Sequence, residues 1–245
     1  MLLLTALLAS CTGHGLHWRA RMAVDATHGI AVLYDQGKYE QAMQEAEKNL
    51  ERVSDFSGYN EQSVFEAYVT RGFCWTITGM SKLMLAVPHT EDGGYRFKDL
   101  FQLEGTAEGG AAELRKGLAE FDQAERMPRR FVAMQDPYHW IGLAHEHLGE
   151  FRLAEEAYRK GVVHAQETSL SPVLVSLLHL RRGNCLKVHA YHIAVVGPED
   201  KAKSRELLKS ARADLAAAVA IGSPTHEPWI GELSKGLEKA EAYFK

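Results

Sequence analysis

The sequence predicts an all-α fold, and two observations support this prediction. Apolar residues recur at three- and four-residue steps, as in Tyr39, Ala42, Ala46 and Leu50, which is the spacing of one face of an α-helix. The alternation of Val, Ile and Thr with polar residues that marks half-buried strands is scarce. With 245 residues, 46% of them hydrophobic and 24% charged, the chain has the composition of an ordinary globular protein.

The most regular stretch is YHWIGLAHEHLGEFRLAEEAYRKG, from Tyr138 to Gly161. Small residues at Gly142, Ala154 and Gly161 allow two antiparallel helices to approach closely, and larger side chains fill the space between them. This spacing resembles the tetratricopeptide repeat (TPR), W-x2-L-G-x2-Y followed by A-x3-F. One hairpin cannot bury its own apolar face. The resemblance therefore implies a right-handed TPR-like solenoid of about four degenerate helical hairpins plus a C-terminal capping helix.

The other helices follow from partial copies of this pattern and from the breakers between them. In the second hairpin, Gly72 takes the place of Gly142, and Phe121 lies in the A-x3-F part of the pattern. Outside the central hairpin, we expect helices from about Met22 to Asp35, from Lys38 onward, from Glu61 to Val87, from Ala111 to Pro128, from Pro172 to Gly197, up to Ile221, and from Pro228 onward.

A long segment over residues 88–110 interrupts the second hairpin where a tight turn is expected. Connections of this length are uncommon within a repeat and often have a function. The segment contains four large apolar side chains, so we expect it to be ordered: Tyr95, Phe97, Leu100 and Phe101. The sequence leaves open whether it binds a partner or only supports the fold.

The N-terminus carries a second signal. The apolar run from Leu2 to Leu8 is too short to span a bilayer, which takes roughly 20 residues, and is typical of the core of a signal peptide. It ends in Leu8-Ala9-Ser10-Cys11, which resembles a bacterial lipobox. The resemblance implies cleavage before Cys11 and acylation of its thiol and amine, and Thr12 resembles the outer-membrane sorting pattern. The alternative is an unprocessed apolar end.

The predicted organisation is a signal peptide over residues 1–10, a lipidated tether over 11–21 and a TPR-like helical domain over 22–245. The implied location is the periplasmic face of the outer membrane, with the bilayer bound through Cys11. A net charge of −4 argues against a nucleic-acid partner, which requires a basic surface.

We find no motif for catalysis or for a cofactor. A G-x-S-x-G elbow, a phosphate-binding glycine loop and an H-E-x-x-H motif are all missing from the sequence. His145 and His147 point about 200° apart on a helix and cannot hold one metal ion together. His189 and His192 could share a metal ion with His139, but surface or core histidines without a metal are the better interpretation. The prediction is a protein that is not an enzyme and has no metal ion or cofactor.

The TPR resemblance implies a partner-binding groove on the first helices of the hairpins. Carried over residue by residue, it predicts a mixed apolar and polar surface that suits a helix or an extended peptide. The predicted groove residues are Tyr34, Asp35, Phe73, Thr76, Ile77, His139, Leu143, Glu146, His147, Asn184, Lys187 and Val188.

The preferred function is a protein-binding scaffold or assembly factor for an envelope complex. By architecture, the chain is similar to outer-membrane pilotins, assembly-machine lipoproteins and the T-component lipoproteins of tripartite (TRAP) transporters. The alternative is a carrier or transporter accessory component that binds a small molecule in an apolar cavity roofed by residues 88–110. Its candidate lining residues are Phe73, Trp75, Tyr95, Phe97 and Trp140.

Cys74 and Cys185 occupy the same repeat position, each two residues after a glycine, in hairpins two repeats apart. Helices of neighbouring hairpins pack about 8–10 Å apart, whereas a disulfide requires α-carbons within about 7 Å. Both thiols are therefore predicted to be free and buried.

Overall fold

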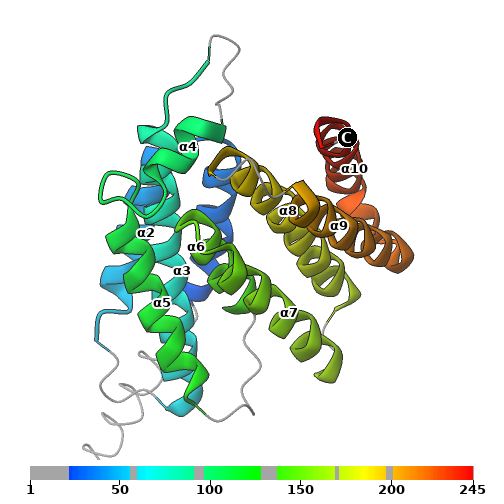
Figure 1. Ribbon diagram of the computed structural model, residues 1–245. Helices are drawn as coiled ribbons and strands as arrows, with labels where there is room; N and C mark the ends of the chain where they lie inside the picture. The colour runs from blue at the N-terminus through cyan, green and yellow to red at the C-terminus, as the bar shows by residue number, and fades with distance from the viewer. Residues whose placement is uncertain are drawn as a thin grey trace, which may run out of the picture. The chain divides into compact units, whose positions relative to one another are not determined.

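The computed structural model describes residues 22–55, 60–90, 97–127, 137–168, 171–196 and 201–244, and these are mostly helical (Figure 1). None of the described residues forms a β-strand. The predicted all-α class is therefore confirmed. In the ranges that the structure describes, we find no helix that is long and apolar enough to cross a membrane.

Residues 22–35 form the first helix, and the labelled helices follow it in chain order. They are α2 (Tyr39–Arg52), α3 (Glu61–Ala86), α4 (Phe97–Leu103), α5 (Ala111–Glu125), α6 (Pro137–His147), α7 (Phe151–Glu167), α8 (Pro172–Val196), α9 (Lys201–Ile221) and α10 (Glu227–Tyr243), with a 3-10 turn over Pro224–His226 before α10. The predicted helices are present with bounds that differ by a few residues. Helix α4 was not predicted.

Several predictions fall outside the described residues. They are the signal peptide over 1–10, the lipidation site Cys11, the tether over 11–21, the breakers Pro128 and Gly197-Pro198, and Tyr95 of the insertion.

The chain forms two compact units. Unit 1 comprises Met1–Val87 and Leu103–Trp140, and unit 2 comprises Pro88–Gln102 and Ile141–Lys245. The two units alternate along the sequence, because residues 88–102 of unit 2 interrupt unit 1.

In unit 1, α3 packs against both α2 and α5. Gly72 of α3 lies directly beneath the ring of Phe121 on α5, where an added Cβ would be 2.6 Å from the ring carbon Cε1. Only a glycine permits so close an approach of the two helices. The same helices are joined by an ion pair between Arg71 and Glu120, with 2.6 Å between Nη2 and Oε1. Asn60 caps the start of α3, because its side-chain oxygen accepts a hydrogen bond from the backbone N–H of Ser63.

In unit 2, α8 packs against α7 and α9, and α10 packs against α8 and α9 (Figure 1). The tight turn between α6 and α7 is made by Gly149, which has a left-handed φ of 72°. Gly142 of α6 lies beneath the ring of Tyr158 on α7, as Gly72 lies beneath Phe121 in unit 1. The core between α8, α9 and α10 is built from leucines, alanines and Phe244.

The described part of the insertion contributes to both units. Leu100 of α4 is buried, and the Phe101 ring packs edge-on against Phe151, with 6.4 Å between centroids, within unit 2. In unit 1, the Thr106 hydroxyl donates to the carbonyl of Leu103 at 2.7 Å and accepts from the N–H of Gly109 at 3.0 Å. These contacts agree with the predicted order for residues 100–109.

Candidate functional site

Half of the predicted groove residues are buried. Phe73, Thr76 and Ile77 of α3 are fully inaccessible to solvent, and Phe73 packs its ring edge-on against Trp140, with 4.6 Å between centroids. The other buried members are His139, Leu143 and Val188. A side chain without accessible surface cannot contact a partner. In this structure these six residues, which flank the packing positions of the repeat, therefore contribute to the packing of the helices.

Tyr34 and Asp35 lie at the end of the helix over residues 22–35. Tyr34 is partly exposed and its ring meets Tyr39 edge-on at 5.3 Å between centroids, whereas Asp35 is exposed. Both belong to unit 1.

The structure brings together three polar members of the predicted groove in unit 2, Glu146, Asn184 and Lys187. Oε1 of Glu146 on α6 accepts a hydrogen bond from Nδ2 of Asn184 on α8 at 3.4 Å. Nζ of Lys187 donates to Oδ1 of Asn184 at 2.9 Å, and the Tyr158 hydroxyl donates to Oε2 of Glu146 at 3.2 Å. We call Glu146, Tyr158, Arg181, Asn184 and Lys187 the Glu146 cluster. It combines charge, hydrogen bonding and partial exposure on α6, α7 and α8.

Burial shapes the electrostatics of this cluster. It raises the pKa of Glu146, although Arg181, the Tyr158 hydroxyl and Lys187 act in the opposite direction. Burial likewise lowers the pKa of Lys187, and the charges of Glu146 and Glu232 act against that shift. Each charged group thus offsets part of the desolvation of the other.

His145 and His147, which flank Glu146, contact different groups. Nδ1 of His145 lies 2.7 Å from Oε2 of Glu150 across the turn after α6. Nδ1 of His147 donates to the carbonyl oxygen of Leu143 at 2.9 Å within α6. Burial lowers the pKa of His147 to about 4, and the nearby Arg181 guanidinium adds to that shift.

The sequence analysis does not predict Arg181 and Trp229 as residues of the site. The Arg181 guanidinium carbon lies 4.7 Å from the ring centroid of Trp229 on α10, a cation–π geometry. The pairing joins α8 to α10. Arg181 precedes Asn184 by one helical turn on the same helix, which places it on the same face.

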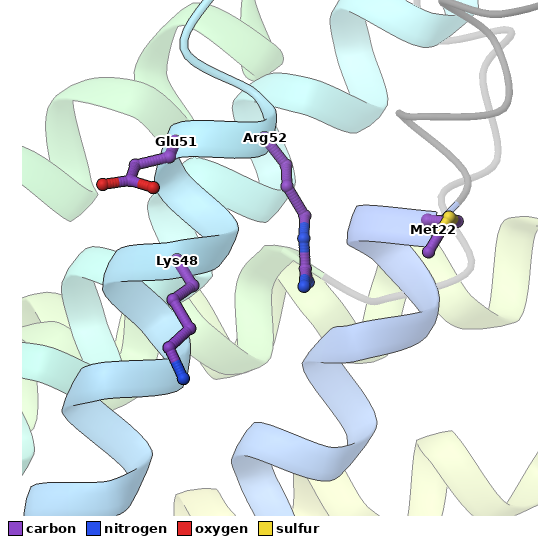
Figure 2. A pocket seen from close by; sticks show the side chains of 4 residues that line it. All are labelled: Met22, Lys48, Glu51 and Arg52. Carbon is purple, nitrogen blue, oxygen red and sulfur yellow. The ribbon is translucent and has the colours of Figure 1, made fainter.

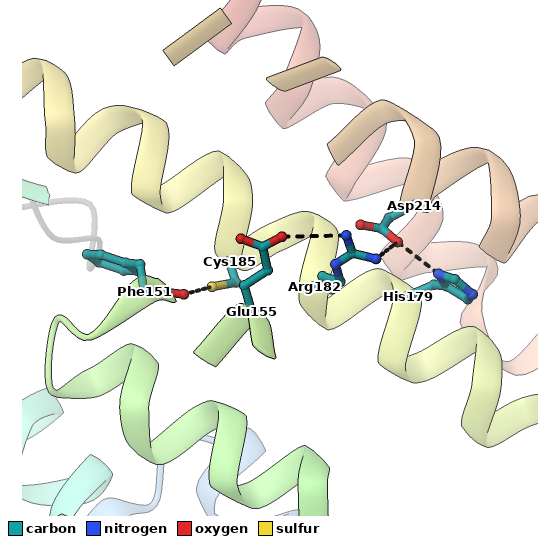
Figure 3. Close-up of polar contacts among 6 residues, drawn as sticks. All are labelled: Phe151, Glu155, His179, Arg182, Cys185 and Asp214. Atoms are coloured by element: carbon teal, nitrogen blue, oxygen red, sulfur yellow. Dashed lines mark hydrogen bonds and ion pairs between the residues drawn. The ribbon is translucent and has the colours of Figure 1, made fainter. Parts of the chain in front are cut away.

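The next residue, Arg182, has a different environment (Figure 3). It donates to Glu155 of α7 at 3.5 Å and to Asp214 of α9 at 3.4 Å. Oδ1 of Asp214 also lies 2.8 Å from Nδ1 of His179. This chain of contacts joins three helices of unit 2, so we assign it to the support of the fold.

His189 and His192 pack with aromatic rings. His189 stacks on Phe151 with 5.2 Å between centroids, and His192 lies 5.0 Å from both Phe101 and Phe151. Among the described residues, no group of three His, Cys, Asp or Glu side chains is placed to hold a metal ion.

A hollow of roughly 510 Å³ in unit 1 is lined by Met22, Lys48, Glu51 and Arg52 (Figure 2). It is open to solvent, and Lys48 pairs with Glu45 at 2.7 Å. Arg52 also has a partner, because its guanidinium donates to Oδ1 of Asn49 at 3.4 Å, so we do not assign the hollow a ligand.

Cys74 and Cys185 are buried and form no disulfide among the described residues, as predicted. Sγ of Cys185 donates to the carbonyl oxygen of Phe151 at 3.8 Å (Figure 3), and Sγ of Cys74 accepts from Nδ2 of Asn49 at 3.7 Å.

Comparisons with known proteins return no match: neither a family model, nor a curated protein, nor a solved structure is similar to the chain.

Proposed function

We propose that the chain is a scaffold that binds a partner protein through a TPR-like helical solenoid and carries out no chemistry of its own. One observation above all supports this: two hairpins share the same internal contact. Gly72 lies beneath Phe121 in unit 1, and Gly142 lies beneath Tyr158 in unit 2. A glycine of the first helix beneath an aromatic ring of the second is what the repeat requires at these positions.

The packing order within each unit supports the same proposal. Helix α3 packs against α2 and α5, and α8 packs against α7 and α9. Solenoids are built from such packing between sequence neighbours, and α10 then acts as the capping helix.

The binding surface that we propose is the Glu146 cluster together with Trp229. In a TPR-like arrangement, α6, α8 and α10 are first helices, the elements that carry the partner. Charged, amide and aromatic side chains meet there. This combination suits a helix or an extended peptide of another protein.

Site-specific photo-crosslinking in the source cells tests the proposal. A benzophenone side chain in place of Asn184 should give a discrete cross-linked protein. The same group in place of Leu153, an exposed residue of α7, should not. Equal cross-linking from both positions, or none from Asn184, would contradict the scaffold.

Native mass spectrometry of the purified chain addresses the alternative, a small-molecule carrier. The ring contact between Phe73 and Trp140 does not favour a carrier, because these rings fill space that a ligand would occupy. Detection of a stoichiometrically bound small molecule would contradict the scaffold and support the carrier.

The proposed location is the outer membrane of a bacterium, facing the periplasm, with lipid on Cys11 as the anchor. The full chain should incorporate an alkyne-tagged palmitate, and Cys11→Ser should lose the label and leave the detergent phase. Unchanged detergent partitioning of Cys11→Ser would refute the anchor. Cys74→Ser is the matched control, since that thiol is buried.

A further inference from the structure

Arg181 is held in place without a hydrogen bond. Its side chain is partly buried and its Nε atom is fully buried, yet none of the described residues accepts a hydrogen bond from its guanidinium group. Its guanidinium carbon lies 4.7 Å from the centroid of the Trp229 ring. The terminal N–H groups of the guanidinium, which form a planar fork, donate to none of the described residues.

The carboxylate of Glu146 is occupied by other donors. Glu146 is close enough for Arg181 to influence its charge, but its two oxygens accept hydrogen bonds from Asn184 and Tyr158. Lys187 is engaged with Asn184 in the same cluster. The cluster thus contains two cations, of which only Lys187 makes a hydrogen bond to another described residue.

We propose that Arg181, presented on Trp229, binds a carboxylate side chain in an acidic segment of the partner protein, and that Glu146 competes with this incoming carboxylate. The inference rests on the proposed function, because it names the chemistry of the partner at the same surface. An arginine fork matches a carboxylate through two parallel hydrogen bonds. Trp229 is 38% exposed, so the pair that it forms with Arg181 lies at an accessible surface.

The surrounding charges favour a carboxylate over a phosphate. Arg181 and Lys187 contribute two positive charges, and Glu146 and Glu232 contribute two negative charges nearby. Both glutamates would repel a phosphate dianion about twice as strongly as a singly charged carboxylate.

The test is an NMR titration of the full chain. The Nε–Hε signal of Arg181, assigned by its loss in Arg181→Lys, is followed as blocked N-acetyl-glutamate methylamide is added. Blocked N-acetyl-glutamine methylamide and inorganic phosphate serve as comparison probes. We expect a saturable shift with the glutamate probe only.

Two variants should change the affinity for the glutamate probe in opposite directions. Arg181→Lys keeps the charge but loses the fork, and binding, followed in this variant by the indole N–H signal of Trp229, should weaken about tenfold. Glu146→Gln removes the competing charge while an oxygen remains for Tyr158, and binding should tighten about threefold or more. Arg159→Lys, on an exposed part of α7, should bind like the wild type. The backbone spectra check that each variant is folded.

The remaining outcomes would each overturn the inference. These are no shift of the Arg181 signal with the glutamate probe, a larger shift with phosphate, an equal shift of the Arg159 Nε–Hε signal, or an unchanged affinity in Glu146→Gln. If cross-linking from Asn184 succeeds while the probe fails, the scaffold remains and only the carboxylate assignment falls. If the probe binds and cross-linking fails, the carboxylate site remains and the scaffold falls.

Discussion

Gly142 and Gly231 lie in helices of unit 2, yet a methyl group should affect them oppositely. A Cβ on Gly142 would overlap the Tyr158 ring, whereas a Cβ on Gly231 of α10 meets nothing within 4 Å. Gly142→Ala should therefore destabilise the fold by about 1–3 kcal/mol. Gly231→Ala should stabilise it by up to about 1 kcal/mol through helix propensity. Urea unfolding should give midpoint shifts of opposite sign. A neutral Gly142→Ala would mean that the helices do not meet at Gly142.

The two buried thiols give a second prediction at this scale. Burial raises the pKa of Cys74 to about 12, so its reactive thiolate is scarce at neutral pH. In native protein carrying Cys11→Ser, Ellman's reagent should find no fast-reacting thiol. After denaturation without reductant, it should find both Cys74 and Cys185. A Cys74–Cys185 crosslink in peptide mapping would contradict the structure.

The sequence predicts some of these residues better than others. Gly72 and Gly142 follow from spacing within one hairpin, because a close helix contact needs a small residue at a fixed step. Arg181 and Trp229 lie on different helices, and nothing in the spacing of α8 indicates which face meets α10. The burial of Phe73 is missed for a similar reason, since it depends on Trp140.

Helix α4 gives a prediction at the scale of the element. The centroid of its Phe101 ring lies 5.0 Å from the centroid of the His192 ring and 6.4 Å from that of the Phe151 ring. Phe101→Ala should remove the contact that holds α4, at a cost of a few kcal/mol at most to that segment. Hydrogen exchange over residues 97–103 should speed up while α9 stays protected. His192→Ala should show the same local effect in weaker form. Faster exchange throughout unit 2 would mean that α4 is part of its main core.

The helix bounds are largely predictable because the sequence signals where helices begin and end. Asn60 caps α3, and Gly149 closes α6 in the left-handed conformation. Helix α4 has only seven residues, fewer than a periodic pattern needs to stand out. It is defined by the rings that it meets in the folded chain.

Acid stability is a property of the whole molecule that follows from its histidines. Burial lowers the pKa of His147 and His189 to about 4, and it also lowers the pKa of His192 and His226. Between about pH 6.5 and 4 the unfolded chain binds these protons and the folded chain does not. Stability therefore falls as the pH falls through this window. Glu146, whose pKa is raised, acts in the opposite direction below its folded pKa.

All four of these histidines belong to unit 2. Urea unfolding at pH 7.5 and pH 5.0, followed by hydrogen exchange, should show unit 2 losing more stability than unit 1. His147→Gln cannot be protonated and should remove about 2 kcal/mol of this dependence. Equal losses in both units, or an unchanged slope in His147→Gln, would contradict the assignment.

The division into two units is not indicated by the sequence. The most regular repeat begins at Tyr138, and the boundary between the units falls within α6, after Trp140. A continuous repeat pattern favours a single domain over residues 22–245, and this domain range remains a prediction.

Because the two units alternate along the chain, the synthesis of unit 2 begins before that of unit 1 is complete. Residues 88–102 belong to unit 2 but emerge from the ribosome before the last part of unit 1, which ends at Trp140. Phe101 is made long before Phe151 and His192, the rings that it packs against. Until α7 and α8 follow, this apolar segment has no native partner within unit 2. A chaperone that holds the growing chain would therefore find its first target here, and a chain cut after Trp140 would leave the segment unsatisfied.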